Sequence, residues 1–173
     1  MTRRELVLIL GAVGGPVFTW AALGFLRKLP SWLLTLETST LVGAFAYTQT
    51  FALAESVILT LVLAGIGGLL PRRWFPAGYV AFACGLGIAG GICMALLHLL
   101  VLMQLRGVGD LELLGAGLLL ALVALGVAVT SARLDGMART TQLLADRLAL
   151  LLWIYVPLSL ASLAIVIARN ISR

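Results

Sequence analysis

The sequence predicts an all-α integral membrane protein, a single-domain bundle of five or six transmembrane helices. Hydrophobic residues make up 62% of the 173 residues and charged residues only 11%, whereas soluble domains carry about 25% charged residues. Of the 12 basic and 7 acidic side chains, all but Glu37 and Glu55 lie in short clusters that bracket long apolar runs. These runs lack the alternation of barrel strands, so they predict spanning helices.

The first span is predicted over residues 5–26. Gly11, Gly14 and Gly15 predict that another helix packs closely against it, and Pro16 predicts a kink. Its apolar run is longer than that of a signal peptide, and no clean small-x-small cleavage site follows. We therefore expect this segment to remain in the protein as its first helix.

The segment between Lys28 and Arg72 allows two interpretations. One helix over residues 29–70 would be about 60 Å long, too long for a single crossing of about 30 Å of hydrocarbon. In the first interpretation, residues 29–52 are external or interfacial and residues 53–70 form one span, which gives five spans. In the second, a hairpin near residues 50–55 produces an extra span, which gives six. We favour five spans, because the polar residues 35–50 would make a poor lipid-facing helix.

The remaining three spans follow a regular pattern of apolar runs and polar borders. They are predicted over residues 76–104, 111–132 and 147–168. Asp110 and Glu112 stand just before the fourth span, where acidic side chains favour a helix N-terminus. The polar residues 133–147 connect the last two spans, and either the fourth helix continues into them or the chain turns at Asp135 and Gly136.

The two cysteines, Cys84 and Cys93, lie nine residues apart on one predicted helix. That spacing separates them by about 13 Å along the helix axis, which is too far for a disulfide bond between them. We expect both to be buried as small apolar side chains.

The basic residues predict the orientation of the chain. With either number of spans, one side of the membrane carries seven basic residues and the other five. The positive-inside rule then places the loops at residues 72–73 and 133–147 in the cytoplasm and the C-terminus outside. Only the N-terminus changes side between the two interpretations. We expect the cell membrane, inner or plasma, as the location.

Glu37 and Glu55 are the candidate functional acids. They are 18 residues apart, so one unbroken helix would place them on the same face. An acid inside a membrane is costly unless it is protonated, hydrated or paired, and it would suit proton or cation coupling. The alternative is that both stand at the aqueous edge. Glu55 would then begin a span, and Glu37 would lie in an external stretch or cap a helix start.

His98, the only histidine, lies late in the third span. Small residues recur there at every fourth position and let another helix approach closely. This expected packing stripe consists of Ala83, Gly87, Gly91, Ala95 and, at its end, His98. We expect the imidazole to form a hydrogen bond across a helix interface. Ligation of a haem or chlorophyll, or a part in a proton relay, remains an alternative.

The function cannot be read from a catalytic motif. The sequence holds no HExxH, CxxC, GxSxG or P-loop pattern, so we expect neither an enzyme nor a bound cofactor. The chain has a net charge of +5. Its basic residues lie in scattered pairs at the ends of spans, which favours lipid headgroups over nucleic acid as a partner.

We expect a subunit that packs against the bilayer and against other membrane subunits or copies of itself. One alternative is an oligomeric transporter or channel component that uses Glu37 or Glu55. A second is a lipid- or pigment-binding subunit that uses His98.

Overall fold

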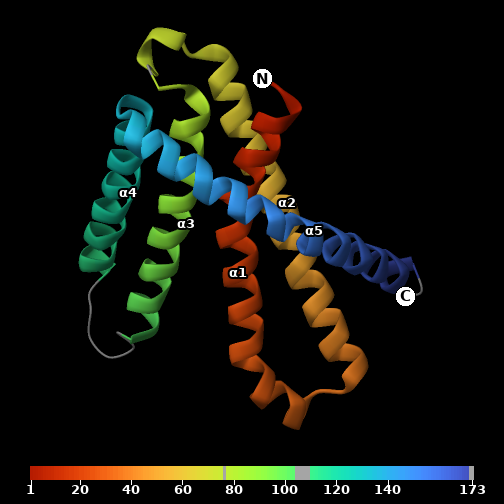
Figure 1. Cartoon of the computed structure of the whole chain (residues 1–173). Coiled ribbons are helices and arrows are strands. Elements are labelled where there is room, and N and C mark those ends of the chain that lie inside the picture. Colours follow the sequence, from red (N-terminus) through yellow and green to blue (C-terminus); the bar gives the residue numbers. More distant parts are fainter. Residues whose placement is uncertain (76, 104–109, 172–173) are drawn as a thin grey trace.

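Five α-helices dominate the computed structural model, which describes residues 1–75, 77–103 and 110–171 (Figure 1). They are α1 Arg3–Thr35, α2 Thr38–Leu69, α3 Tyr79–Met103, α4 Asp110–Arg133 and α5 Asp135–Ile171, with the short 3-10 turn η1 Arg72–Trp74 before α3. Within this described part there is no β-strand. All five helices are long and apolar enough to cross a membrane, which indicates a multi-pass membrane protein.

The first two helices are longer than the sequence predicted. The chain reverses at Leu36 and Glu37, and α2 then runs unbroken to Leu69. The hairpin expected near residues 50–55 in the six-span interpretation is therefore wrong. The helix that contains the predicted second span begins at Thr38 and not at residue 53, because the polar residues before residue 53 are helical as well.

A local hydrogen-bond pattern shows how the helix accommodates this polar stretch. The hydroxyls of Thr48 and Thr50 donate to the carbonyls of Ala44 and Ala46, both at 2.8 Å. A hydroxyl that bonds to the carbonyl one turn earlier needs no partner outside its own helix. The polar composition of this segment therefore suggested more contact with water than its side chains require.

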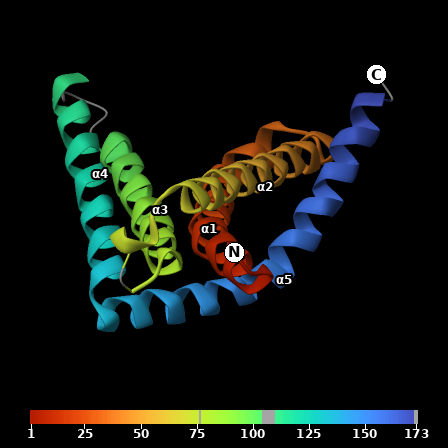
Figure 2. The same cartoon turned by 90° about the horizontal axis from the view of Figure 1, so that it is seen from above.

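The last helix begins earlier than predicted. Residues 135–147, expected as a polar connection, form the first part of α5. The chain turns at Leu134, just before Asp135 and Gly136, where a turn was expected and the structure is helical. Ala138, Thr141 and Ala145 are buried at helical spacing, while the charged residues beside them are exposed. Figure 2 shows this part running from the end of α4 past α3 and α1 before α5 bends and continues beside α2.

The core forms where α1 meets α3 and α5. Ile9, Ala12 and Val13 pack there against Ala83, Cys84 and Ala145. A Cβ atom added at Gly11 would stand 2.8 Å from the Ala149 Cα, so α1 and α5 approach almost backbone to backbone. The close packing expected from the first glycines is thus present. Cys84 and Cys93 are both free and buried, as predicted.

α2 and α3 both pack along α1 but diverge from one another. They meet near η1, where the Tyr79 hydroxyl donates a hydrogen bond of 2.6 Å to the Leu63 carbonyl. From this point the two helices separate toward the end at which α1 turns into α2 (Figure 1). The predicted third span was to begin at residue 76 and end at residue 104, and both positions lie outside the described residues. Between the diverging helices lies a groove that residues of α1, α2 and α3 line.

Candidate functional site

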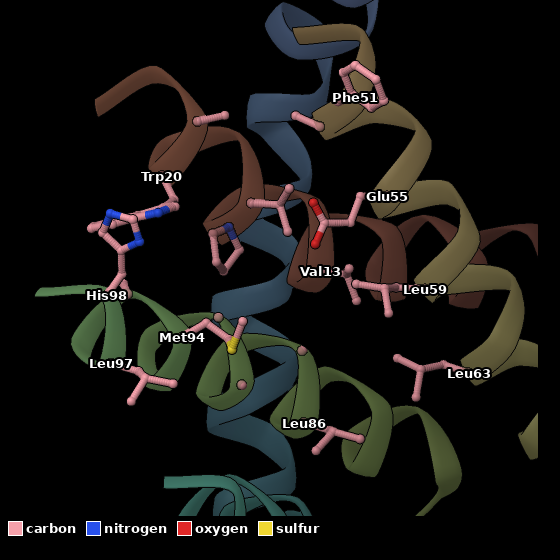
Figure 3. A pocket seen from close by; sticks show the side chains of 18 of the residues that line it. Val13, Trp20, Phe51, Glu55, Leu59, Leu63, Leu86, Met94, Leu97 and His98 are labelled. Carbon is pink, nitrogen blue, oxygen red and sulfur yellow. The ribbon is translucent and has the colours of Figure 1, made fainter. Parts of the chain in front are cut away.

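An apolar groove with a volume of about 760 Å³ occupies the space between α1, α2 and α3 (Figure 3). Val13, Pro16 and Val17 of α1 form part of its lining. Side chains between residues 48 and 63 of α2 and between residues 86 and 101 of α3 form its two walls. Nearly all of these side chains are apolar, so the few polar ones stand out as candidates for function.

Glu55 points into this groove from α2 (Figure 3). Its carboxylate is exposed, and in the described part of the chain it has no hydrogen bond or ion pair. It lies about 26 Å from the start of α2 and about 21 Å from the end by the helical rise. Every stretch of about 30 Å along α2 that could match the hydrocarbon core contains it. Glu55 does not stand at the start of its helix, since α2 begins at Thr38.

Glu37 lies away from the groove. It is the N-cap residue of α2, and its carbonyl accepts the backbone N–H groups of Thr40 and Leu41, each at 3.0 Å. Its side chain makes no capping hydrogen bond, so the suggested capping role holds for the backbone only. Eighteen residues of helical rise separate it from Glu55 by about 27 Å along the axis. The two acids thus do not form one site.

His98 lines the groove from α3 and meets Trp20 of α1 (Figure 3). The two rings are edge to face, with centroids 5.0 Å apart and planes at 74°. This contact across the α1–α3 interface is aromatic, whereas the sequence led us to expect a hydrogen bond there. No hydrogen bond of the imidazole is found among the described residues. The participation of Trp20 was missed, because an isolated tryptophan in an apolar span has no distinguishing pattern.

The small residues of α3 pack on α1. A Cβ atom added at Gly87 would stand 3.0 Å from a Val13 methyl, and one added at Gly91 would clash with Pro16. Ala83 is fully buried in the core, and Ala95 lines the groove. These contacts form the base of the groove, because they hold α3 close to α1 while α2 stays apart from α3.

Two buried polar groups were not predicted at all. The Oε1 atom of Gln49 on α2 and the Oγ atom of Ser159 on α5 have no hydrogen-bond partner within the described structure. The two residues are 2% and 0% exposed, respectively. Nothing in their sequence spacing could have revealed this, because burial here depends on how α5 bends across the bundle.

The groove can receive an apolar molecule and offer it one acid and one imidazole. In residues 1–75, 77–103 and 110–171, no three His, Cys, Asp or Glu side chains come together as a metal site. Comparison with protein-family models, with curated proteins and with solved structures gives no match.

Proposed function

We propose that this protein is a non-catalytic subunit of a larger membrane assembly, in which its outer helix faces pack against helices of other chains or of further copies. The observation that carries this proposal is the open shape of the bundle. The chain exposes 11109 Å² of surface, whereas a compact monomer of its mass would expose roughly 8,100 Å². The excess is helix surface that a closed bundle would bury within itself.

The buried share of the apolar stretch is lowest in α4 and α5. In the most apolar stretches of α4 and α5, 11% and 17% of the residues are buried. Leu114, Leu118 and Leu122 follow one another along α4 at four-residue spacing, and all three are largely exposed. Helices in a membrane associate through close van der Waals packing, which such edge helices can provide on their free sides.

Purification from the native membrane tests this proposal. We expect the tagged chain, extracted in a mild detergent, to migrate as a particle larger than its own 18.3 kDa plus the detergent belt. Native mass spectrometry would give the composition of that particle. A stable, lone monomer would contradict the assembly role.

Open glycine positions offer variants that locate the docking face. In the described part of the chain, a Cβ atom at Gly24, Gly65, Gly115 or Gly126 would meet no side chain and no backbone of another segment within 4 Å. Replacement by phenylalanine should therefore leave the single chain folded and obstruct a partner only where one packs. We expect the replacements at Gly115 and Gly126, on α4, to dissociate the assembly, and those on other free faces to leave it intact.

A second candidate is a transporter or channel component that uses Glu55. The supporting observation is that this acid lines an open groove at the middle of α2, where proton or cation coupling would require it. Flux of protons or monovalent cations in proteoliposomes tests the idea. Glu55→Gln should abolish flux and Glu37→Gln should retain it. A parent protein without flux contradicts this candidate and leaves the assembly role standing.

A further inference from the structure

We propose that the groove between α1, α2 and α3 binds a small organic cation with an apolar body, whose positive charge pairs with the carboxylate of Glu55. This site lies within one chain and involves none of the outer faces of α4 and α5. It is therefore independent of the assembly role, and either proposal can fail without the other.

The dimensions of the groove suit a small molecule. Its volume of about 760 Å³ lies within the range of roughly 300–1,000 Å³ that is typical of small-molecule sites. The lining runs from Thr48 to Leu63 on α2 and from Leu86 to Val101 on α3, about 22 Å of helix on either wall. A ligand with several rings or a medium-length chain would fill it.

The charge of the groove selects a cation. Among the described residues that line it there is no lysine or arginine, and His98, which also lines it, is in contact with Trp20. A carboxylate without a partner is unfavourable in hydrocarbon, and a cation brought beside it offsets that cost. Trp20 and Phe51 also line the groove, and aromatic rings attract cations. An apolar cation would thus satisfy both the walls and the acid.

The closed end of the groove argues against a partner helix. Tyr79 and Leu63 join α3 to α2 there through their hydrogen bond, and the side chain of Tyr79 packs against Gly67. A helix that crosses the membrane is about 10 Å wide and has to leave the groove at both ends. The α2–α3 junction blocks that exit at one end, so the groove fits a compact molecule better.

The position of Glu55 argues against a membrane lipid. The charged headgroup of a lipid stays at the membrane interface, whereas Glu55 lies within the hydrocarbon stretch in every placement of α2 considered above. Only the acyl chain of a lipid would reach this depth, and it carries no charge. A lipid therefore leaves the carboxylate without a partner, as in the empty groove.

Binding of tetraphenylphosphonium, a compact apolar cation, to the purified full-length chain in detergent tests the proposal. Quenching of tryptophan fluorescence or equilibrium dialysis would give the affinity. We expect saturable binding that weakens by about tenfold or more in Glu55→Gln, the loss of roughly one charge contact. Glu55→Asp, which keeps the charge, should retain most of the affinity. Tetraphenylborate, an anion of the same shape, should not show this dependence on residue 55.

Matched variants separate the groove from the rest of the chain. Gly90 lines the groove and has open space around it. Gly126 on α4 also has open space around it, but it is not among the residues that line the groove. Gly90→Phe should therefore reduce phosphonium binding, whereas Gly126→Phe and Glu37→Gln should not. A groove filled by acyl chains or by a partner helix would show no phosphonium binding, or binding whose affinity does not change when residue 55 is replaced. Either result would overturn the proposal.

Discussion

The Tyr79 hydroxyl donates a hydrogen bond of 2.6 Å to the backbone carbonyl of Leu63, and this contact joins α3 to α2 at the closed end of the groove. Leu63 lines the groove at this end. The partial burial of Tyr79 and its edge-to-face contact with Phe75 hold the ring in place. The Tyr79 side chain thus holds α2 and α3 together at the point from which they diverge.

Tyr79→Phe should weaken this junction. Loss of one hydrogen bond lowers the free energy of unfolding by about 1 kcal/mol, which denaturant titration in detergent micelles would measure. Spin labels at the exposed positions Ile58 and Leu96, in a chain with both cysteines replaced, should show a longer or broader distance between α2 and α3. Tyr155→Phe is the control, because the Tyr155 hydroxyl faces Thr19 at 3.3 Å and not the α2–α3 junction. Unchanged stability and label distances in Tyr79→Phe would show that the junction does not depend on this bond.

Adjacent glycines on α3 offer a test of the α1–α3 contact. A Cβ atom at Gly91 would clash with Pro16, whereas one at Gly90 would meet nothing within 4 Å. Gly91→Ala should therefore destabilise the protein by roughly 1–3 kcal/mol through overpacking. Gly90→Ala should be neutral or stabilise it by up to about 1 kcal/mol, because alanine favours the helix. Equal stabilities of the two variants would contradict the packing described for this face.

The first part of α5 can be tested in the same way. Ala145 is fully buried in the core, and its neighbour Asp146 is half exposed, 3.9 Å from Arg4. Ala145→Leu should lower the free energy of unfolding by about 1–3 kcal/mol. Asp146→Asn should change it by less than about 1 kcal/mol, because an exposed ion pair contributes little. A tolerated Ala145→Leu would show that residues 135–147 do not pack as a helix against α1 and α3.

The sequence predicted the five helices because their apolar runs and polar borders are long and clear. It placed the start of α2 wrongly, because the hydroxyls of Thr48 and Thr50 are satisfied within the helix and do not require water. It treated residues 135–147 as a connection because their charges are conspicuous. The small buried residues Ala138, Thr141 and Ala145, at spacings of three and four, were the signal that could have identified a helix.

The groove could not be predicted in the same way. Glu55 and His98 were both recognised as candidates, but nothing in their spacing shows that they line one space. That space arises because α3 follows α1 closely through Gly87 and Gly91 while α2 diverges from Tyr79 onward. Such divergence depends on tertiary packing. Which of Glu37 and Glu55 lines the groove could therefore be decided only once the helix boundaries were known.

The orientation of the chain yields another prediction. The N-terminus, η1 and the α4–α5 junction lie toward one end of the bundle, and the α1–α2 turn lies at the other (Figure 1). Together with the surplus of basic residues, this arrangement favours a cytoplasmic N-terminus and an external C-terminus. Reporter fusions active on only one side of the membrane, placed at each end of the chain, would check it. A cytoplasmic C-terminus would contradict the assignment.

The depth of residue 55 is the most direct test of the account, because both the groove site and the transport candidate require an acid inside the membrane. A spin label at residue 55, in a chain with both cysteines replaced and reconstituted in bilayers, can be compared with a label at residue 37. Collisions with oxygen, which concentrates in hydrocarbon, and with a water-soluble nickel complex report the depth of each label. We predict that the label at residue 55 is accessible to oxygen and protected from nickel, and that the label at residue 37 shows the opposite. Strong access of nickel at both positions would place Glu55 at the aqueous edge and contradict the account.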